Sequence, residues 1–349
     1  MAEHFVDTEL GEMLHENEEQ ITRQIAEAIA AKVEQGPRPA LRDAHPKAHG
    51  IVSAEFRVND HLPPQFAQGI FVPGKRYKAW IRFSNASPNA AQPDAMADAR
   101  GMAIKLLDVQ GEAILPDDHG AKTQDFIMIN FPAFFIDNPA NYLALIHRSG
   151  SSNPLAKVGQ LLALGIKGAI IAKEVNSSKI ASPLETRYWS MVPYRLGDPP
   201  HKQAIKFSAR PRLSATSTIP GDPSPNFLRE RLIQQLAEGE ASFDFEIQPR
   251  TSADMSVEDP TIEWDENDAP FFKVATITIP KQSFATPERD QFGENLSFSP
   301  WHALPQHRPL GAVNRVRHVV YQTISDLRRK LNDSTFQQPA AASSEIAVG

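Results

Sequence analysis

Cysteine is absent from this sequence of 349 residues. The absence excludes disulfides, thiolate zinc sites, iron–sulfur clusters and cysteine nucleophiles. Excess positive charge is also missing, since the formal net charge is −6. We therefore expect no nucleic acid bound through bulk charge. Any chemistry must use His, Tyr, Ser, Asn, Arg or carboxylate side chains.

Long hydrophobic runs are missing as well. The longest candidate, 155–175, is interrupted by Lys157, Lys167 and Lys173 and is too broken to span a bilayer. We expect a helix that packs on the protein rather than on a membrane surface, with no stable membrane insertion. The N-terminus lacks the basic and apolar regions of a secretory signal, so the expected location is cytoplasmic. The hydrophobic fraction of 41% is that of an ordinary soluble globular protein.

Hydrophobic periodicity predicts helices toward both ends and a β-rich body between them. Residues 17–35 carry apolar side chains at every fourth position from Ile21 to Val33, with Asn17 as N-cap. Residues 139–175 also predict helix. Short β-like runs separated by Pro, Gly, Asn and Asp favour an antiparallel sheet or barrel. These runs are 51–58, 76–84, 100–109, 125–136, 202–213, 241–250 and 271–280.

The same pattern divides the chain into four expected parts. A helical arm covers 1–37, and a β-barrel domain with inserted helices covers 38–285. A Pro-rich connector and a last helix cover 286–331, and a tail of small residues covers 332–349. The composition of the tail predicts that it is disordered.

The last helix is predicted from Asn314 as its N-cap, and it carries an unusual face. Arg317, Tyr321 and Arg328 fall on one side of it. An Arg one turn before a Tyr can hold a guanidinium against the phenolic oxygen, which favours the phenolate. A tyrosinate is a competent axial ligand of ferric haem. From this helix alone, amphipathic packing with solvated arginines stays open as the alternative.

Five motifs in order resemble the haem catalase superfamily, in particular its short bacterial catalase-like members, the catalase-related peroxidases. They are "RDAH", "IRFSN", "DARGMAIKL", "INFPAFFIDNP" and "RHVVYQTISDLR", within roughly 38–331. The resemblance implies an α+β fold, with an antiparallel β-barrel of about eight strands, flanking helices and a C-terminal helix that supplies the haem ligand. It also implies haem b, iron protoporphyrin IX, as the cofactor.

On the distal side, the resemblance implies three catalytic residues. His45 matches the distal histidine, Ser84 the hydroxyl that orients its imidazole, and Asn130 the distal asparagine. The stretch after His45 departs from the family pattern, which makes His49 a rival for the distal role. Pro46 favours an extended backbone at the residue before it, His45.

The cofactor-binding residues implied by the resemblance are Tyr321 and four arginines. Tyr321 matches the axial ligand of the haem iron, and Arg317 matches its charge partner. Arg42, Arg82 and Arg328 match the arginines that bind the haem propionates. Arginine suits this task because its planar fork pairs with carboxylates through two parallel hydrogen bonds.

The implied function is that of a haem-dependent oxidoreductase of catalase type, which decomposes hydrogen peroxide or reduces organic hydroperoxides. Two alternatives stay open: an isomerase of fatty-acid hydroperoxides, and a non-catalytic haem-binding or sensing protein. The expected partner is a small-molecule peroxide, and assembly into a homo-oligomer is left open.

Overall fold

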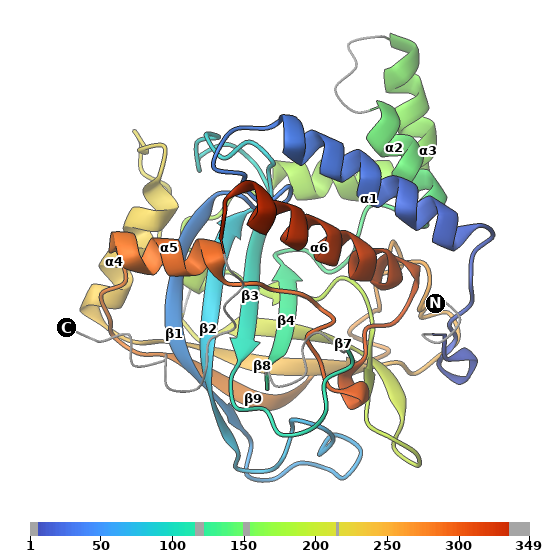
Figure 1. The fold of residues 1–349 in the computed structure, drawn as a ribbon. Helices are drawn as coiled ribbons and strands as arrows, with labels where there is room; N and C mark the ends of the chain where they lie inside the picture. Colours follow the sequence, from blue (N-terminus) through green and yellow to red (C-terminus); the bar gives the residue numbers. More distant parts are fainter. Residues whose placement is uncertain (1–5, 116–121, 149–153, 214–215, 335–349) are drawn as a thin grey trace.

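Eight antiparallel strands close into a barrel in this computed structural model, which describes residues 6–115, 122–148, 154–213 and 216–334. The described residues form nine strands, of which all but β6 belong to the ring: β1 (Ala48–Val58), β2 (Arg76–Asn85), β3 (Arg100–Leu106), β4 (Gln124–Ile129), β5 (Tyr188–Trp189), β6 (Tyr194–Leu196), β7 (Gln203–Pro211), β8 (Ala241–Pro249) and β9 (Phe272–Ile279). The ring closes because β5 pairs with both β4 and β7 and β9 pairs with β1, while β6 adds to β7. The predicted α+β fold with a barrel of about eight strands is confirmed (Figure 1).

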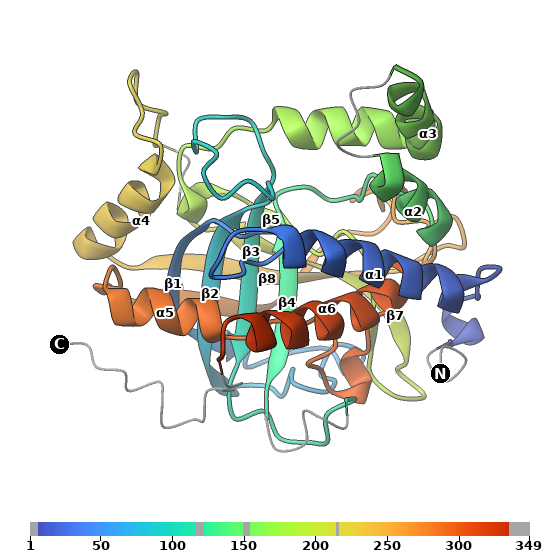
Figure 2. The same cartoon turned by 45° about the horizontal axis from the view of Figure 1, so that its top comes forward.

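Helices cover the outside of the barrel. The α-helices of the described residues are α1 (Glu18–Gln35), α2 (Pro139–Arg148), α3 (Pro154–Ser177), α4 (Phe227–Glu238), α5 (Pro287–Asn295) and α6 (Ala312–Leu331), and short 3₁₀ turns occupy Thr8–Leu10, Pro183–Glu185 and Pro305–His307. Figures 1 and 2 show α5 and α6 lying across the outer face of β1–β4, with α1 beside α6. The wall formed by β1–β4 is therefore sandwiched between the barrel interior and these helices.

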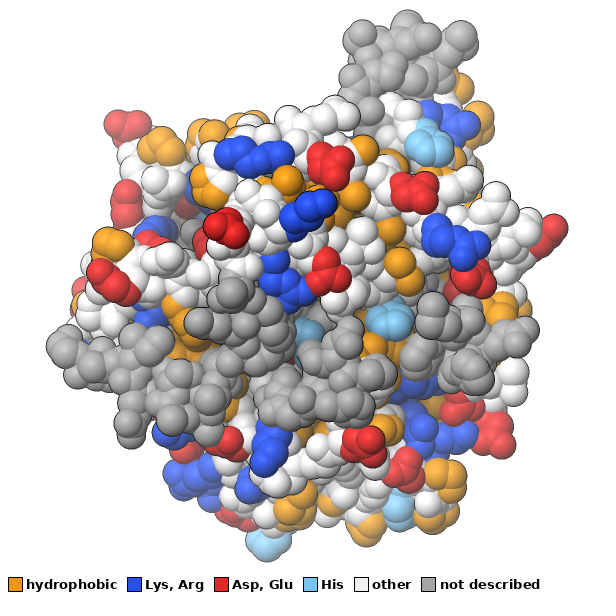
Figure 3. Space-filling view, viewed as in Figure 1, with side chains coloured by type: hydrophobic (Ala, Val, Ile, Leu, Met, Phe, Trp, Pro, Cys, Tyr) orange, Lys and Arg blue, Asp and Glu red, His pale blue; other side chains and the backbone are white. Residues whose placement is uncertain are grey.

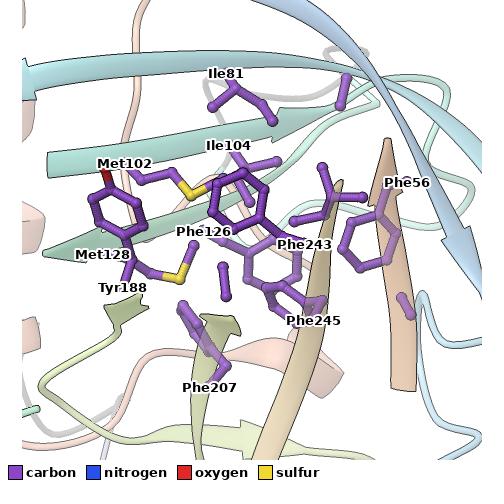
Figure 4. Packing of buried hydrophobic residues seen from close by; sticks show 14 of the residues in the cluster. Phe56, Ile81, Met102, Ile104, Phe126, Met128, Tyr188, Phe207, Phe243 and Phe245 are labelled. Carbon is purple, nitrogen blue, oxygen red and sulfur yellow. The ribbon is translucent and has the colours of Figure 1, made fainter. Parts of the chain in front are cut away.

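The barrel interior is filled by side chains, because alternate residues of each strand point inward. The ring of Phe126 lies 6.1 Å from that of Phe56, 5.1 Å from that of Phe207 and 4.7 Å from that of Phe245, measured between centroids. Figure 4 shows these rings packed together with methionine and isoleucine side chains from the surrounding strands. A ligand site must therefore lie outside the barrel wall.

For the two terminal helices, the sequence predicts the extent more closely than the N-cap. α1 matches the predicted span, although the side chain of Asn17 makes no capping hydrogen bond. The prediction of Asn314 as N-cap of the last helix is wrong, since α6 begins at Ala312 after Gly311. Asn314 instead lies in the first turn, where its amide donates to the carbonyl oxygens of Leu310 and Pro193.

Several elements were not predicted. The strands β5 and β6 are two and three residues long, too short to show a periodic pattern. The helices α4 and α5 were also missed, and α5 lies in the stretch that we interpreted as a connector. Within the described residues no helix is both long enough and apolar enough to cross a membrane. Most of the predicted tail, from residue 335 on, lies outside the described residues.

Candidate functional site

The outer face of the barrel wall beneath α6 is left partly accessible. Arg82, Ala103 and Ile127 form one row across β2, β3 and β4. Ala103 and Ile127 are the only residues of their strands that are not fully buried. Residues 317–321 of α6 are partly accessible too. No pattern in the sequence singles out Ala103 and Ile127, because their small exposure becomes visible only once the strands pair.

His45 lies at one edge of this wall and is held by Ser84. Its Nδ1 is 3.0 Å from Ser84 Oγ. Its ring rests on Gly101 of β3, where an added Cβ would lie only 2.6 Å from ring atoms. The extended backbone expected from Pro46 is wrong, since His45 adopts a left-handed φ of 59°. The contacts with Ser84 and Gly101 outweigh the local preference.

The environment of His45 keeps its imidazole neutral. Burial, followed by the nearby charges of Arg82, Arg317 and Arg42, lowers its pKa to about 3. With Nδ1–H donated to Ser84, the lone pair of Nε2 can accept a proton. His45 can therefore serve as a base at neutral pH.

His49, the rival histidine, occupies a different environment. It is buried at the start of β1, and its Nδ1 is 3.8 Å from Asp94 Oδ2. Neither ring nitrogen has a hydrogen-bond partner within the described part of the chain. Burial lowers its pKa to about 4. The structure therefore pairs Ser84 with His45 and leaves His49 beside a carboxylate.

Asn130 directly follows β4 and is anchored at both ends of its amide. Its Oδ1 accepts from the backbone N–H of Arg100 at 2.7 Å, and its Nδ2 donates to Ser178 Oγ at 2.9 Å. The preceding residue, Ile129, pairs with Gly101, on which the ring of His45 rests. An amide nitrogen carries two hydrogens, so one remains for a ligand after the bond to Ser178.

Tyr321 and Arg317 form the pair expected on α6. Arg317 donates to Tyr321 Oη at 3.2 Å and to Asn314 Oδ1 at 3.1 Å. Burial works to lower the pKa of Arg317, but Tyr321 and the buried Tyr194 outweigh it and raise this pKa above its ordinary value. Because Arg317 also lowers the pKa of His45, the His45 and Tyr321 sides of the site are electrostatically coupled.

Arg42, Arg82 and Arg328 converge on one carboxylate, Glu294 of α5, which sequence reasoning missed. Their guanidinium nitrogens lie 2.9, 3.5 and 3.4 Å from its oxygens. We call these four residues the arginine cradle. Burial lowers the pKa of Arg82 to about 9 and that of Arg328 to about 10. Burial opposes ionisation of Glu294, yet the three arginines hold its pKa below the ordinary value.

The charges of the arginine cradle do not balance. Three guanidinium groups face a single carboxylate, which leaves two positive charges in excess. Arg82 is buried, its Nε has no hydrogen-bond partner in the described residues, and its contacts to Glu294 and to the carbonyl oxygen of Pro46 are both 3.5 Å long. A buried cation with so few partners is costly. The cradle is therefore suited to an anionic ligand with two charges.

Comparisons with known proteins agree with this geometry. The family model described as "Catalase" matches residues 24–159. A "Catalase-related peroxidase" of Mycolicibacterium paratuberculosis is 29% identical over 302 residues, which cover 84% of this chain and 90% of that protein. "Catalase easC" of Arthroderma otae is 27% identical over 111 residues, or 32% of this chain and 20% of that protein.

Solved catalase structures share the fold. A fungal catalase has a TM-score of 0.67 at 18% identity, covering 91% of this chain and 66% of its own. Catalase A from Saccharomyces cerevisiae has a TM-score of 0.60 at 18% identity, covering 90% of this chain and 68% of its own. This chain thus spans about two thirds of the length of these catalases.

The barrel and its covering helices have the fold of the solved catalases. In sequence the chain is similar to the catalase-like family, and in fold it is similar to the solved catalases. Members of this family generally bind haem.

Proposed function

We propose that the protein is a haem b-dependent peroxidase or catalase that acts on hydrogen peroxide or organic hydroperoxides. The observation that carries the proposal is the positive charge left uncompensated in the arginine cradle. Haem has two propionates, and their two negative charges equal the excess of the cradle. The under-partnered guanidinium of Arg82 and the pairing of Tyr321 with Arg317 also fit this group.

In this proposal each residue beneath α6 has a distinct part in holding the cofactor. Tyr321 would bind the haem iron through its phenolic oxygen, to which Arg317 donates a hydrogen bond. Arg42, Arg82 and Arg328 bind the propionates. Bound haem supplies an iron centre that exchanges electrons with peroxide.

In this proposal His45 carries out the proton transfer. Nε2 takes a proton from one oxygen of the peroxide and returns it to the other, a task that requires a neutral imidazole. Burial and the neighbouring arginines provide that state by lowering its pKa. Ser84 fixes the orientation of the ring through Nδ1. Asn130 uses its remaining amide hydrogen to position the peroxide without titrating.

The first test is the absorption spectrum of the protein expressed with ample haem. We expect a Soret band, and we expect Tyr321→Phe to reduce haem affinity at least about tenfold or to shift the band, because the anionic ligand is lost. Tyr142→Phe is the matched control, since this phenol packs in the hydrophobic cluster formed by α1, α2 and α6. Absence of the Soret band in the unaltered protein contradicts the proposal. A spectrum unchanged by Tyr321→Phe contradicts the ligand assignment.

The second test identifies the reaction. Hydrogen peroxide and a bulky organic hydroperoxide are compared for dioxygen release and for reductant-dependent formation of alcohol. His45→Gln should abolish most turnover while the Soret band remains. Consumption of a fatty-acid hydroperoxide without reductant, alcohol or dioxygen would instead identify an isomerase. A haem-loaded protein that turns over no peroxide would be a binding or sensing protein.

A further inference from the structure

The helix α3 exposes large aliphatic side chains on both sides of a kink at Gly165. Of the eleven large hydrophobic side chains exposed in the described residues, five lie on this helix, and Leu162 and Ile166 are the most exposed at 76% and 86%. Other side chains of α3 are buried, among them Ala163, Ile171 and Val175. The expectation that this segment packs on the protein is therefore correct for part of the helix only. The exposed side chains are Val158, Leu161, Leu162, Ile166 and Ile170.

The helix is bent, and its first arm stands away from the body. Gly165 interrupts it with a non-helical φ of 63° and ψ of 175°. Figures 1 and 2 show α2 and the first arm of α3 as a projecting hairpin, and Figure 3 shows hydrophobic side chains along its edge. The second arm rests on the body, because Gly168 lets it approach the carbonyl oxygen of Phe135 closely. The hairpin can thus touch a flat surface without obstruction by the barrel.

The segment from α2 to just beyond the end of the second arm of α3 has a charge opposite in sign to that of the whole chain. Residues 139–179 contain five Lys and Arg, one Glu and no Asp, whereas the chain has a net charge of −6. Lys167 is exposed directly after Ile166, and Lys173 is exposed three residues after Ile170. Lys179 follows the end of the helix. Exposed aliphatic groups accompanied by lysines are typical of helices that lie in the interface of an anionic membrane.

An apolar hollow adjoins the hairpin. It has a volume of about 420 Å³ and lies between α1 and α2, where Ile21 and Leu143 line it and His147 and Arg148 also contribute. Exposed acidic residues of α1, such as Glu19, make α3 rather than α1 the side that faces anionic lipid.

We propose that the hairpin of α2 and α3 docks on the surface of a membrane that contains anionic phospholipid. The aliphatic side chains enter the boundary between headgroups and acyl chains, and the lysines contact the headgroups. A second copy of the chain fits less well, because pairing the same face of two copies would bring their lysines together. The proposal concerns binding at the interface and is independent of haem and of peroxide turnover.

The hairpin is directly connected to the candidate site. Ser178, the residue after α3, accepts the hydrogen bond of Asn130 Nδ2. Ile171 and Val175 belong to the same hydrophobic cluster as Phe131 and Phe135, which follow Asn130. Docking would therefore hold the Asn130 side of the site close to the membrane, where hydrophobic molecules accumulate.

The test is flotation of the purified full chain with vesicles. We expect binding to vesicles of phosphatidylcholine and phosphatidylglycerol in equal amounts, and much weaker binding to phosphatidylcholine alone. The double variant Leu162→Ser with Ile166→Ser should reduce binding at least about tenfold, because it removes the two most exposed aliphatic groups. The matched control is Val72→Ser with Met96→Ser, whose side chains are 52% and 54% exposed outside the hairpin. This control should bind like the unaltered protein.

Substitution of the lysines tests the same proposal independently. Lys167→Gln and Lys173→Gln should each weaken binding to the anionic vesicles about fivefold, with no effect on phosphatidylcholine vesicles. Failure of the unaltered chain to float with anionic vesicles overturns the proposal. So does equal loss of binding in the Val72 and Met96 control. Light scattering is run in parallel, and a dimer that the Leu162 and Ile166 variant converts to a monomer, without vesicle binding, shows that a second copy covers this face.

Discussion

Two buried clusters of charged side chains lie at opposite ends of α6, and both are built around arginine. The arginine cradle includes Arg328 near the C-terminal end. The other, which we call the N-terminal cluster, includes Arg315 near the start of the helix. Its members are Glu12, Glu18, Glu258, Arg308 and Arg315, with His15 at its edge.

In the N-terminal cluster the charges balance. Arg315 contacts Glu12, Glu18 and Glu258 at 3.0, 2.6 and 3.1 Å. His15 Nε2 lies 3.6 Å from Glu258 Oε2, and this carboxylate raises the pKa of the imidazole. Three carboxylates thus face two arginines and one histidine. Despite burial, these carboxylates raise the pKa of Arg315.

In the arginine cradle the pKa of a buried arginine is lowered rather than raised. Burial lowers the pKa of Arg82 to about 9, and the single carboxylate of Glu294 does not compensate for it. The N-terminal cluster is thus complete within the chain and joins the N-terminal segment to α6. The cradle is incomplete within the chain. The difference teaches that a ligand site can be recognised by buried charges that the protein itself leaves unbalanced.

The largest effect is expected from breaking the balanced cluster. Arg315→Met should lower the free energy of unfolding by about 3–5 kcal/mol, because it leaves several buried carboxylates without their main partner. Urea denaturation of the haem-free protein measures this loss. Arg23→Met is the control, since the Arg23–Glu19 pair is exposed and should change stability by less than about 1 kcal/mol. Equal stability of Arg315→Met and Arg23→Met would show that the N-terminal cluster contributes little.

The same substitution in the cradle should separate stability from ligand binding. Arg82→Met should leave the stability of the haem-free protein within about 1 kcal/mol, since it removes a buried cation with weak partners. It should weaken haem binding about tenfold to a hundredfold, because a charge-assisted hydrogen bond contributes about 1.5–3 kcal/mol. Urea denaturation and Soret titration measure the two quantities.

Glu294→Gln completes this contrast. It removes the one carboxylate of the cradle, and the haem-free protein should lose stability while added haem restores part of it. A loss of stability from Arg82→Met as large as that from Arg315→Met would show that the cradle, too, is a structural cluster. The contrast between the two ends of α6 would then fail.

The sequence could reveal the arginines of the cradle but not its charge balance. Arg42, Arg82 and Arg328 stand in short motifs at the right distance from other site residues, so a resemblance was sufficient to single them out. Glu294 stands in a stretch with proline and glycine that suggested a connector, and only the formation of α5 brings its carboxylate to the three guanidinium groups. Contacts between segments more than 200 residues apart leave no local pattern.

Prediction of the fold from the sequence is limited in the same way. The pattern of short β-like runs bounded by Pro, Gly, Asn and Asp predicted the seven long strands. It could not predict β5, whose two residues close the ring. The apolar residues of α3 predicted a helix correctly. Periodicity alone does not say which apolar face the body covers, so the exposure of Leu162 and Ile166 could be seen only in the folded chain.

The smallest expected effect is that of the cradle's positive charge on the pKa of His45. Burial and Arg82 lower the pKa of His45 to about 3 in the folded chain, whereas an unfolded histidine titrates near about 6.5. As the pH falls below about 6.5, the unfolded chain therefore binds a proton that the folded chain does not, and this group costs stability down to about pH 3. His45→Gln should make the stability of the haem-free protein fall less steeply over that range.

The titration of His45 can be followed directly by nuclear magnetic resonance, which should show the imidazole neutral above about pH 4. Arg82→Met should raise the midpoint of this titration. The midpoint should stay below the unfolded value, because burial is the larger cause of the lowered pKa. A midpoint that Arg82→Met does not move, or moves no more than Arg23→Met does, would show that the unbalanced charge of the cradle does not reach His45.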